Sequence, residues 1–175
     1  MTVKKTVRDL GIGKLKADLA ELRTTKVTVG WQGPSGQTPH AESSDGTTLE
    51  RIAAYHEFGT RRMPARPVIR TTYDRHSVEF RDELKRAVSA LVDRRSELDP
   101  AVDRIGLFAV DKLREEMDAS KAWAAELAQA TIDAKGHDVP LIDTRQLQNA
   151  ASYAVRTAGE GDSVGIAIKR QGGER

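Results

Sequence analysis

The chain of 175 residues contains no cysteine, which excludes disulfide bonds, thiolate metal ligands and cysteine nucleophiles. Aromatic side chains make up only 5% of the residues, so we expect a largely aliphatic core. No apolar run approaches the ~18 residues that cross a bilayer, and residues 1–22 lack the apolar stretch of a secretory signal. We therefore expect one domain, 1–175, with no membrane partner.

Charge of either sign is nearly balanced, with a net charge of +2, which is too small to predict nucleic-acid binding by itself. The charged residues are nevertheless not spread evenly along the chain. Between residues 51 and 75 six arginines stand against Glu57 and Asp74, namely Arg51, Arg61, Arg62, Arg66, Arg70 and Arg75. The chain thus has one basic region.

A catalytic pattern is also missing. The four histidines, at positions 40, 56, 76 and 137, do not have the spacing of a metal site. Neither a nucleotide-binding glycine motif nor a local serine–histidine–acid pattern occurs. We therefore expect no enzyme activity, no cofactor and no metal site.

The first half of the chain predicts short elements around a loop. Leucines at spacings of four and three predict a helix over 12–23, and alternation predicts a strand over 26–32. Turn-forming and small polar residues predict a flexible loop over 33–46. The spacing of Thr47 and Glu50 is that of a capping box, and Gly59 is suited to end the helix that follows, with a positive φ.

The second half predicts long helices and then strands. A helix is expected over 68–98, with an apolar stripe of Ile69, Tyr73, His76, Phe80, Leu84, Ala87 and Leu91. Asp99 and Pro100 predict the start of another helix. Segments 152–157 and 164–169 alternate around the turn 158–162 and predict a hairpin, and 170–175 is expected to fray.

These elements predict an α+β fold. We expect a small antiparallel sheet, formed by the strand near 26–32 and the C-terminal hairpin, packed with the long helix and two or three further helices.

Two phrases stand out, IAAYHEFGTRRMPARPVIR at 52–70 and PLIDTRQLQNAASY at 140–153. In the first, two prolines hold a basic segment extended. We interpret it as an interface for a neighbouring subunit or partner, formed by Gly59, Arg61, Arg62, Pro64, Arg66, Pro67 and Arg70. In particular, Arg66 and Arg70 are expected to meet partner carboxylates. The second is interpreted as a connector motif formed by Pro140, Asp143, Thr144 and Leu147, with Asp143 or Thr144 capping a short helix. On residue type alone, both phrases also fit plain corners of the fold.

Together and in this order, the phrases resemble the neck, tail-completion or virion morphogenesis proteins of Mu-like and lambda-like tailed phages. That family carries phrases like IAxxHEFGTxxxPARPFxR and PLIDTGxLxxSIxY. The matching residues are Ile52, Ala53, His56, Glu57, Phe58, Gly59, Thr60, Pro64, Ala65, Arg66, Pro67, Arg70, Pro140, Leu141, Ile142, Asp143, Thr144, Leu147 and Tyr153. Arg145 departs from the pattern, since it stands where the family usually has glycine.

The resemblance implies a structural virion protein and no enzyme. Family proteins form rings, commonly of six subunits, at the head–tail joint, and complete or terminate the tail. The implied partners are other copies of the chain, the head connector or stopper protein, the tail tube protein, and genomic DNA passing through the lumen. The implied location is the neck at the tail top, after assembly in the host cytoplasm. The alternative is a small nucleic-acid-binding protein that uses the arginines of 61–70 without sequence preference.

Overall fold

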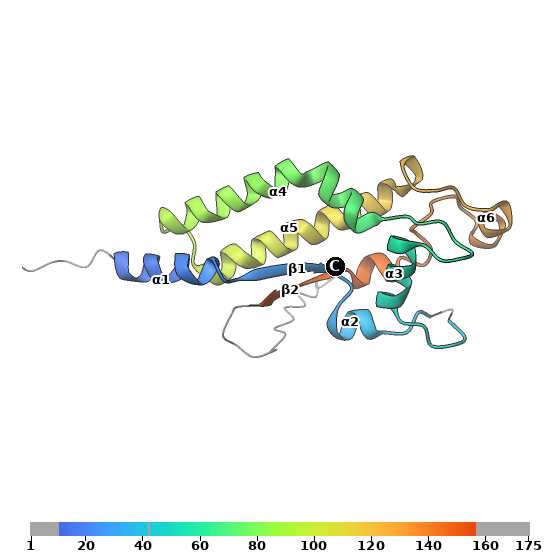
Figure 1. Cartoon of the computed structure of the whole chain (residues 1–175), viewed down its shortest axis with the longest axis horizontal. Helices are drawn as coiled ribbons and strands as arrows, with labels where there is room; N and C mark the ends of the chain where they lie inside the picture. Colours follow the sequence, from blue (N-terminus) through green and yellow to red (C-terminus); the bar gives the residue numbers. More distant parts are fainter. Residues whose placement is uncertain (1–10, 42, 157–175) are drawn as a thin grey trace, which may run out of the picture.

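The computed structural model describes residues 11–41 and 43–156. In this part the helices are α1 (Ile12–Leu22), α2 (Gly33–Gln37), α3 (Leu49–Phe58), α4 (Val68–Val92), α5 (Leu98–Asp118), the 3-10 turn η1 (Ala119–Ala122), α6 (Gln129–Lys135) and α7 (Gln146–Ala150). The strands are β1 (Lys26–Gly30) and β2 (Ser152–Arg156). The molecule is elongated, with α1 at one end and α3 and α6 at the other (Figure 1).

The two strands form an antiparallel sheet that joins the beginning and the end of the described chain. The register runs from Lys26 opposite Arg156 to Gly30 opposite Ser152. The α+β fold with a small antiparallel sheet is confirmed, although β1 ends two residues earlier than predicted. The second strand of the predicted hairpin, 164–169, and the tail 170–175 lie outside the described residues.

The helix α5 covers the sheet, and a glycine makes this close approach feasible. A Cβ on Gly106 would lie 2.2 Å from the ring of Tyr153, so only glycine leaves room for the ring against the helix backbone. The hydroxyl of Tyr153 then donates to Asp103 at 3.0 Å. The aromatic ring thereby fixes β2 to α5.

The long helix α4 packs along α5, as Figure 1 shows, with a face that agrees with the predicted stripe only in part, at His76, Ala87 and Leu91. Its buried residues are Val68, Thr72, His76, Glu83, Ala87 and Leu91. Ile69, Tyr73 and Leu84 of the predicted stripe are 43%, 65% and 46% exposed. The apolar stripe is therefore turned partly away from α5, because α4 uses polar side chains for much of that contact.

Two apolar clusters make up the core. The larger one joins Trp31, α3 and α5 to Leu141, Ile142 and Leu147 near the chain's end. The smaller one brings Ala87 and Leu91 of α4 together with the start of α5, and the strand residues Val27 and Val155 pack against it. The expected aliphatic core is confirmed in the described residues, with Trp31 and Tyr153 as its buried aromatic side chains.

The segment 33–46 has more regular structure than predicted. Its first residues form α2, and an isolated bridge joins Pro39 to Thr48. The side chain of Gln146 accepts from the N–H of Ala41 and donates to the carbonyl of Pro39. Several polar groups of its described residues thus find partners within the chain, an ordering that the low apolar content of the segment did not indicate.

Three helix boundaries also differ from prediction. α3 has Thr48 as its N-cap residue without a side-chain cap, since Thr47 instead donates to Asp45. The long helix α4 ends at Val92, before the predicted end at residue 98, and α5 begins at Leu98. Leu98 is buried and is the first residue of α5, which therefore begins one residue before the predicted position at Asp99.

Candidate interaction site: arm, connector and apolar groove

Residues 59–70, which we call the arm, leave α3 through a sharp turn. Gly59 has a φ of 74°, and a Cβ at this position would lie 2.9 Å from the backbone nitrogen of Ala65. The predicted positive φ is confirmed, and close backbone contact adds a second requirement for glycine. A short bridge between Thr60 and Met63 closes the turn.

Glu57 has a structural role that the sequence did not indicate. Its carboxylate is buried and accepts hydrogen bonds from the backbone N–H groups of Ile69 at 2.9 Å and Arg70 at 3.2 Å. These amides belong to the first turn of α4, where backbone donors lack partners within the helix. The glutamate therefore caps α4 from a position twelve residues earlier and fixes both ends of the arm.

Arg66 does not face a partner as predicted. It is only 4% exposed, and its guanidinium donates to the carbonyl oxygens of Ala125 at 2.8 Å and Glu126 at 3.1 Å. Its backbone N–H donates to the carbonyl of His56. The prediction of a partner contact at Arg66 is wrong, because these groups inside the chain already engage it.

The other predicted arm residues are more accessible. Arg61, Arg62, Pro64 and Arg70 are exposed, whereas Pro67 is half-buried. Beside them, Phe58 at the end of α3 is 74% exposed. A large exposed aromatic side chain next to exposed arginines has the composition of a protein-binding surface.

Residues 140–147, which we call the connector, are divided between core and surface. Pro140 and Leu147 are buried, whereas Asp143 and Thr144 are exposed. The carbonyl oxygen of Leu147 accepts a hydrogen bond of 2.6 Å from the indole of Trp31. The short helix predicted here is present as α7, which begins at Gln146.

The start of α7 also accounts for the departure at Arg145. Its N-cap is Arg145 in the left-handed conformation, with a φ of 59° and without a side-chain cap. The prediction of a cap from Asp143 or Thr144 is therefore wrong. Glycine, the residue of the resembling phrase at this position, adopts this conformation more easily than arginine.

The two sequence phrases meet at one cavity. This cavity, which we call the arm–connector cavity, has a volume of about 240 Å³. Its walls come from α3, the arm, α6 and the connector, and include Ile52, His56, Met63, Arg66, Leu127, Lys135, Ile142, Asp143 and Leu147. Segments about 70 residues apart in the sequence thus line the same space.

His56 is the least satisfied polar residue of this cavity. Its Nδ1 atom is buried without a hydrogen-bond partner. Burial, and then the positive charges of Arg66 and Lys135, lower the pKa of His56 to about 4. The imidazole is therefore neutral near pH 7, and it lies between cations.

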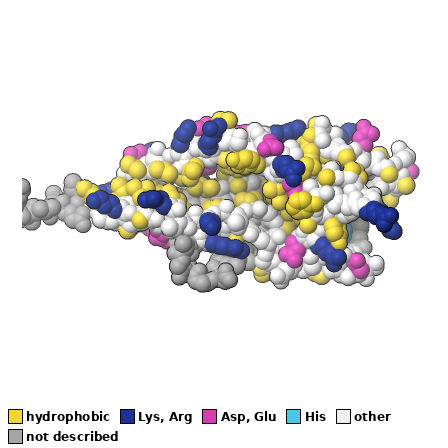
Figure 2. All heavy atoms as spheres, viewed as in Figure 1, with side chains coloured by type: hydrophobic (Ala, Val, Ile, Leu, Met, Phe, Trp, Pro, Cys, Tyr) yellow, Lys and Arg dark blue, Asp and Glu magenta, His cyan; other side chains and the backbone are white. Residues whose placement is uncertain are grey.

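A second hollow, which we call the apolar groove, runs between α4 and β1 over α5. It has a volume of about 320 Å³ and is lined by Val27, Val29, Ile69, Thr72, Tyr73, Phe80, Ile105, Ala109 and Leu113. Figure 2 shows hydrophobic side chains gathered in a band across this face. Among the described residues β1 pairs only with β2, so one edge of β1 has no strand partner there.

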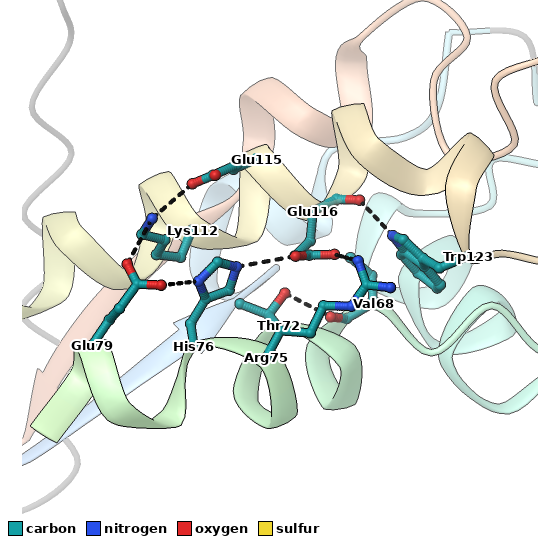
Figure 3. A network of polar contacts seen from close by, with 9 residues as sticks. All are labelled: Val68, Thr72, Arg75, His76, Glu79, Lys112, Glu115, Glu116 and Trp123. Carbon is teal, nitrogen blue, oxygen red and sulfur yellow. Dashed lines mark hydrogen bonds and ion pairs between the residues drawn. The ribbon is translucent and has the colours of Figure 1, made fainter.

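A chain of polar contacts links α4 to α5, with the buried side chains of His76 and Glu116 at its centre (Figure 3). The ring of His76 contacts Glu79 at 2.7 Å and Glu116 at 3.0 Å. Arg75 donates to the other oxygen of Glu116 at 3.1 Å, and Lys112 pairs with Glu79. His76 lines neither the cavity nor the groove, so this network joins helices and has no access to a ligand at either place.

Two absences hold within residues 11–41 and 43–156. No group of three or more histidine and acidic side chains is placed to hold a metal ion. No helix in this part is long and apolar enough to cross a membrane.

Comparison with known proteins gave no match: no family model fits the chain, and neither a curated protein nor a solved structure is similar to it.

Proposed function

We propose that the protein is a structural, non-enzymatic component of a tailed-phage virion. It forms a ring, of six copies as the resemblance implies, at the neck between head and tail. There it completes or terminates the tail and connects it to the head connector or stopper protein, with the tail tube protein as the other neighbour. Genomic DNA passes through the lumen without sequence reading. Subunits assemble in the host cytoplasm and stay at the tail top.

The observation that carries this proposal is the apolar groove beside β1, a strand with one edge that has no partner among the described residues. Ile69 and Tyr73 on its rim are 43% and 65% exposed, and contiguous apolar surface of this kind is typical of an interaction site. An open strand edge offers backbone donors and acceptors to an added strand. A neighbouring copy in a ring meets such a surface with a different surface of its own.

The arm supplies the polar part of the proposed contact. Arg61, Arg62 and Arg70 are exposed around it and are suited to carboxylates on a neighbour or to phosphates in the lumen. The backbone at Arg145 adds support for the resemblance, since a positive φ occurs where the family phrase has glycine.

Images of the particle neck, together with two matched variants, test the proposal. We expect six copies around the axis, and a purified subunit that is monomeric or weakly associated. Tyr73→Asp places a charge in the groove and should prevent incorporation into particles. Val78→Asp makes the same kind of change at a residue that is 57% exposed on α4 but does not line the groove; it should be incorporated normally.

Either of two results would contradict the proposal. One is a neck that contains one or two copies of the protein. The other is an isolated monomer that binds DNA with a steep salt dependence that is lost in an Arg61→Ala, Arg62→Ala, Arg70→Ala variant. That result would favour the nucleic-acid-binding alternative.

A further inference from the structure

We propose that the arm–connector cavity is a binding site for a carboxylate group carried by a protein partner, either an acidic side chain or a chain end. The inference does not depend on ring formation and concerns a different place from the apolar groove. It rests on the charges, the unpartnered nitrogen and the size of the cavity.

The charges in the cavity favour an anion. Arg66 and Lys135 bring two positive charges close enough to His56 for both to lower the pKa of its ring. A third cation, Arg145, is already bonded to Asp118 and Gln148. The carboxylate among the lining residues belongs to Asp143, which is exposed. A bound carboxylate would offset the positive charges of the buried Arg66 and the half-buried Lys135.

The donors that such a group needs are present. Lys135 donates to the carbonyl oxygen of Val139 at 3.0 Å, and an ammonium group has two further hydrogens to donate. The buried Nδ1 of His56 has no partner, and a neutral imidazole can carry its proton on either nitrogen. An unpaired buried polar atom costs about 1–3 kcal/mol, so a ligand that accepts from His56 removes a penalty.

The cavity has the size of a side chain. Its volume of about 240 Å³ lies below the ~300 Å³ at which pockets for drug-sized ligands begin. Ile52, Met63 and Leu127 contribute apolar wall, which suits the methylene groups of a glutamate or the aliphatic side chain of a terminal residue. A carboxylate on a short aliphatic stem therefore fits better than a phosphate or a large cofactor.

Nuclear magnetic resonance of the His56 ring in the full chain tests the inference. The first probe is the blocked peptide acetyl-Ala-Glu-Ala-amide, and its control is the same peptide with Gln. The second probe is acetyl-Ala-Ala-Leu with a free carboxyl end, and its control is the corresponding amide. We expect a saturable shift of the His56 resonances with at least one carboxylate peptide and none with the controls. The tighter of the two carboxylate peptides identifies the source.

Three variants sharpen the test. Lys135→Gln should weaken binding about 10-fold or more, as the loss of a charge-assisted hydrogen bond predicts. Asp143→Asn removes the competing carboxylate and should tighten it. Lys16→Gln, an equal change of charge on exposed α1 at the opposite end of the molecule (Figure 1), should leave binding unchanged.

A second readout does not depend on the variants. A bound carboxylate stabilises the imidazolium form, so the measured pKa of His56 should rise from about 4 in saturating Glu peptide but not in Gln peptide. The proposal is overturned if millimolar carboxylate peptides give no saturable shift, if amide and carboxylate peptides act alike, or if Lys135→Gln binds as tightly as the wild type.

Discussion

The guanidinium of Arg66 donates through Nε to the carbonyl oxygen of Ala125 at 2.8 Å, which ties the arm to the segment between η1 and α6. Replacing Arg66 by alanine removes this bond and the one to Glu126, and leaves two carbonyl groups without these donors. We expect a loss of about 2–3 kcal/mol in the free energy of unfolding, since hydrogen bonds to charged groups are each worth roughly 1.5–3 kcal/mol before relaxation. Urea unfolding measures it.

The matched control is Arg62→Ala, in the same arm but exposed. Its effect should stay within about 0.5 kcal/mol, as for surface substitutions in general. If the two variants were equally stable, the hydrogen bonds of Arg66 to Ala125 and Glu126 would not contribute to the stability of the fold.

Glu57 should prove to be a stabilising cap. Glu57→Ala removes the acceptor for the N–H groups of Ile69 and Arg70, and we expect a loss of about 1–2 kcal/mol, as for other N-terminal helix caps. Glu57→Gln keeps one acceptor oxygen, so its stability should lie between that of the wild type and that of Glu57→Ala. Thermal unfolding gives the order; an alanine variant as stable as the wild type would rule out the cap.

The backbone at Arg145 should favour glycine over alanine. Because its φ is 59°, Arg145→Gly should be more stable than Arg145→Ala by about 1 kcal/mol, which is the scale of the left-handed penalty for a residue with a Cβ. Comparing the two variants with each other cancels the lost contacts to Asp118 and Gln148. If alanine equals glycine in chemical denaturation, the left-handed conformation is not strained.

His56 should make the protein less stable in acid. The pKa of His56 in the folded chain, about 4, lies below the ordinary value of 6.5. At a pH between these two values the imidazole is therefore mostly protonated in the unfolded chain and mostly neutral in the folded chain. The free energy of unfolding should therefore fall as pH decreases from ~6.5 to ~4, by up to ~3 kcal/mol for this group. The difference between the wild type and His56→Gln, measured over this range, should show the fall; a difference independent of pH would contradict it.

His76 should act in the opposite direction. Burial lowers its pKa, but hydrogen bonds to Glu79 and Glu116 outweigh burial and raise the pKa above 6.5. The stabilisation from the protonated ring is then fully present below ~6.5 and is lost as pH rises through the raised value. The advantage of the wild type over His76→Gln should shrink with rising pH. An advantage that grows instead would mean that the neutral ring is the better partner of Glu116.

The sequence predicted the kinds of elements better than their contacts. Alternation at Val27 and Val29 placed β1, and the spacing in α4 placed a long helix, because local periodicity carries that information. It identified the face of α4 that contacts α5 only in part, since Thr72 and Glu83, which lay outside the predicted stripe, are buried there. Buried polar residues leave no apolar pattern to detect.

The candidate site was predicted in part. Gly59 was correctly assigned a positive φ from its place after an amphipathic helix. Arg66 was misassigned, because its partners are backbone carbonyls about sixty residues away, and any residue type supplies such carbonyls. Lys135 belongs to neither of the two sequence phrases. Its place beside His56 depends on how α6 folds back toward the arm.

The buried charges between α4 and α5 also set a length scale. Glu83 pairs with Arg104, and Glu116 with His76 and Arg75. Sliding α4 by one turn, ~5.4 Å, would separate these pairs and strand both carboxylates in the interior. The ion pairs therefore allow only one lengthwise position of α4 relative to α5, and the length of α4 is a fixed spacing in the molecule. The 25 residues of α4 hold the arm ~37 Å from the turn that leads into α5. A partner that contacts both ends of α4 must therefore have its two contact sites at the same distance.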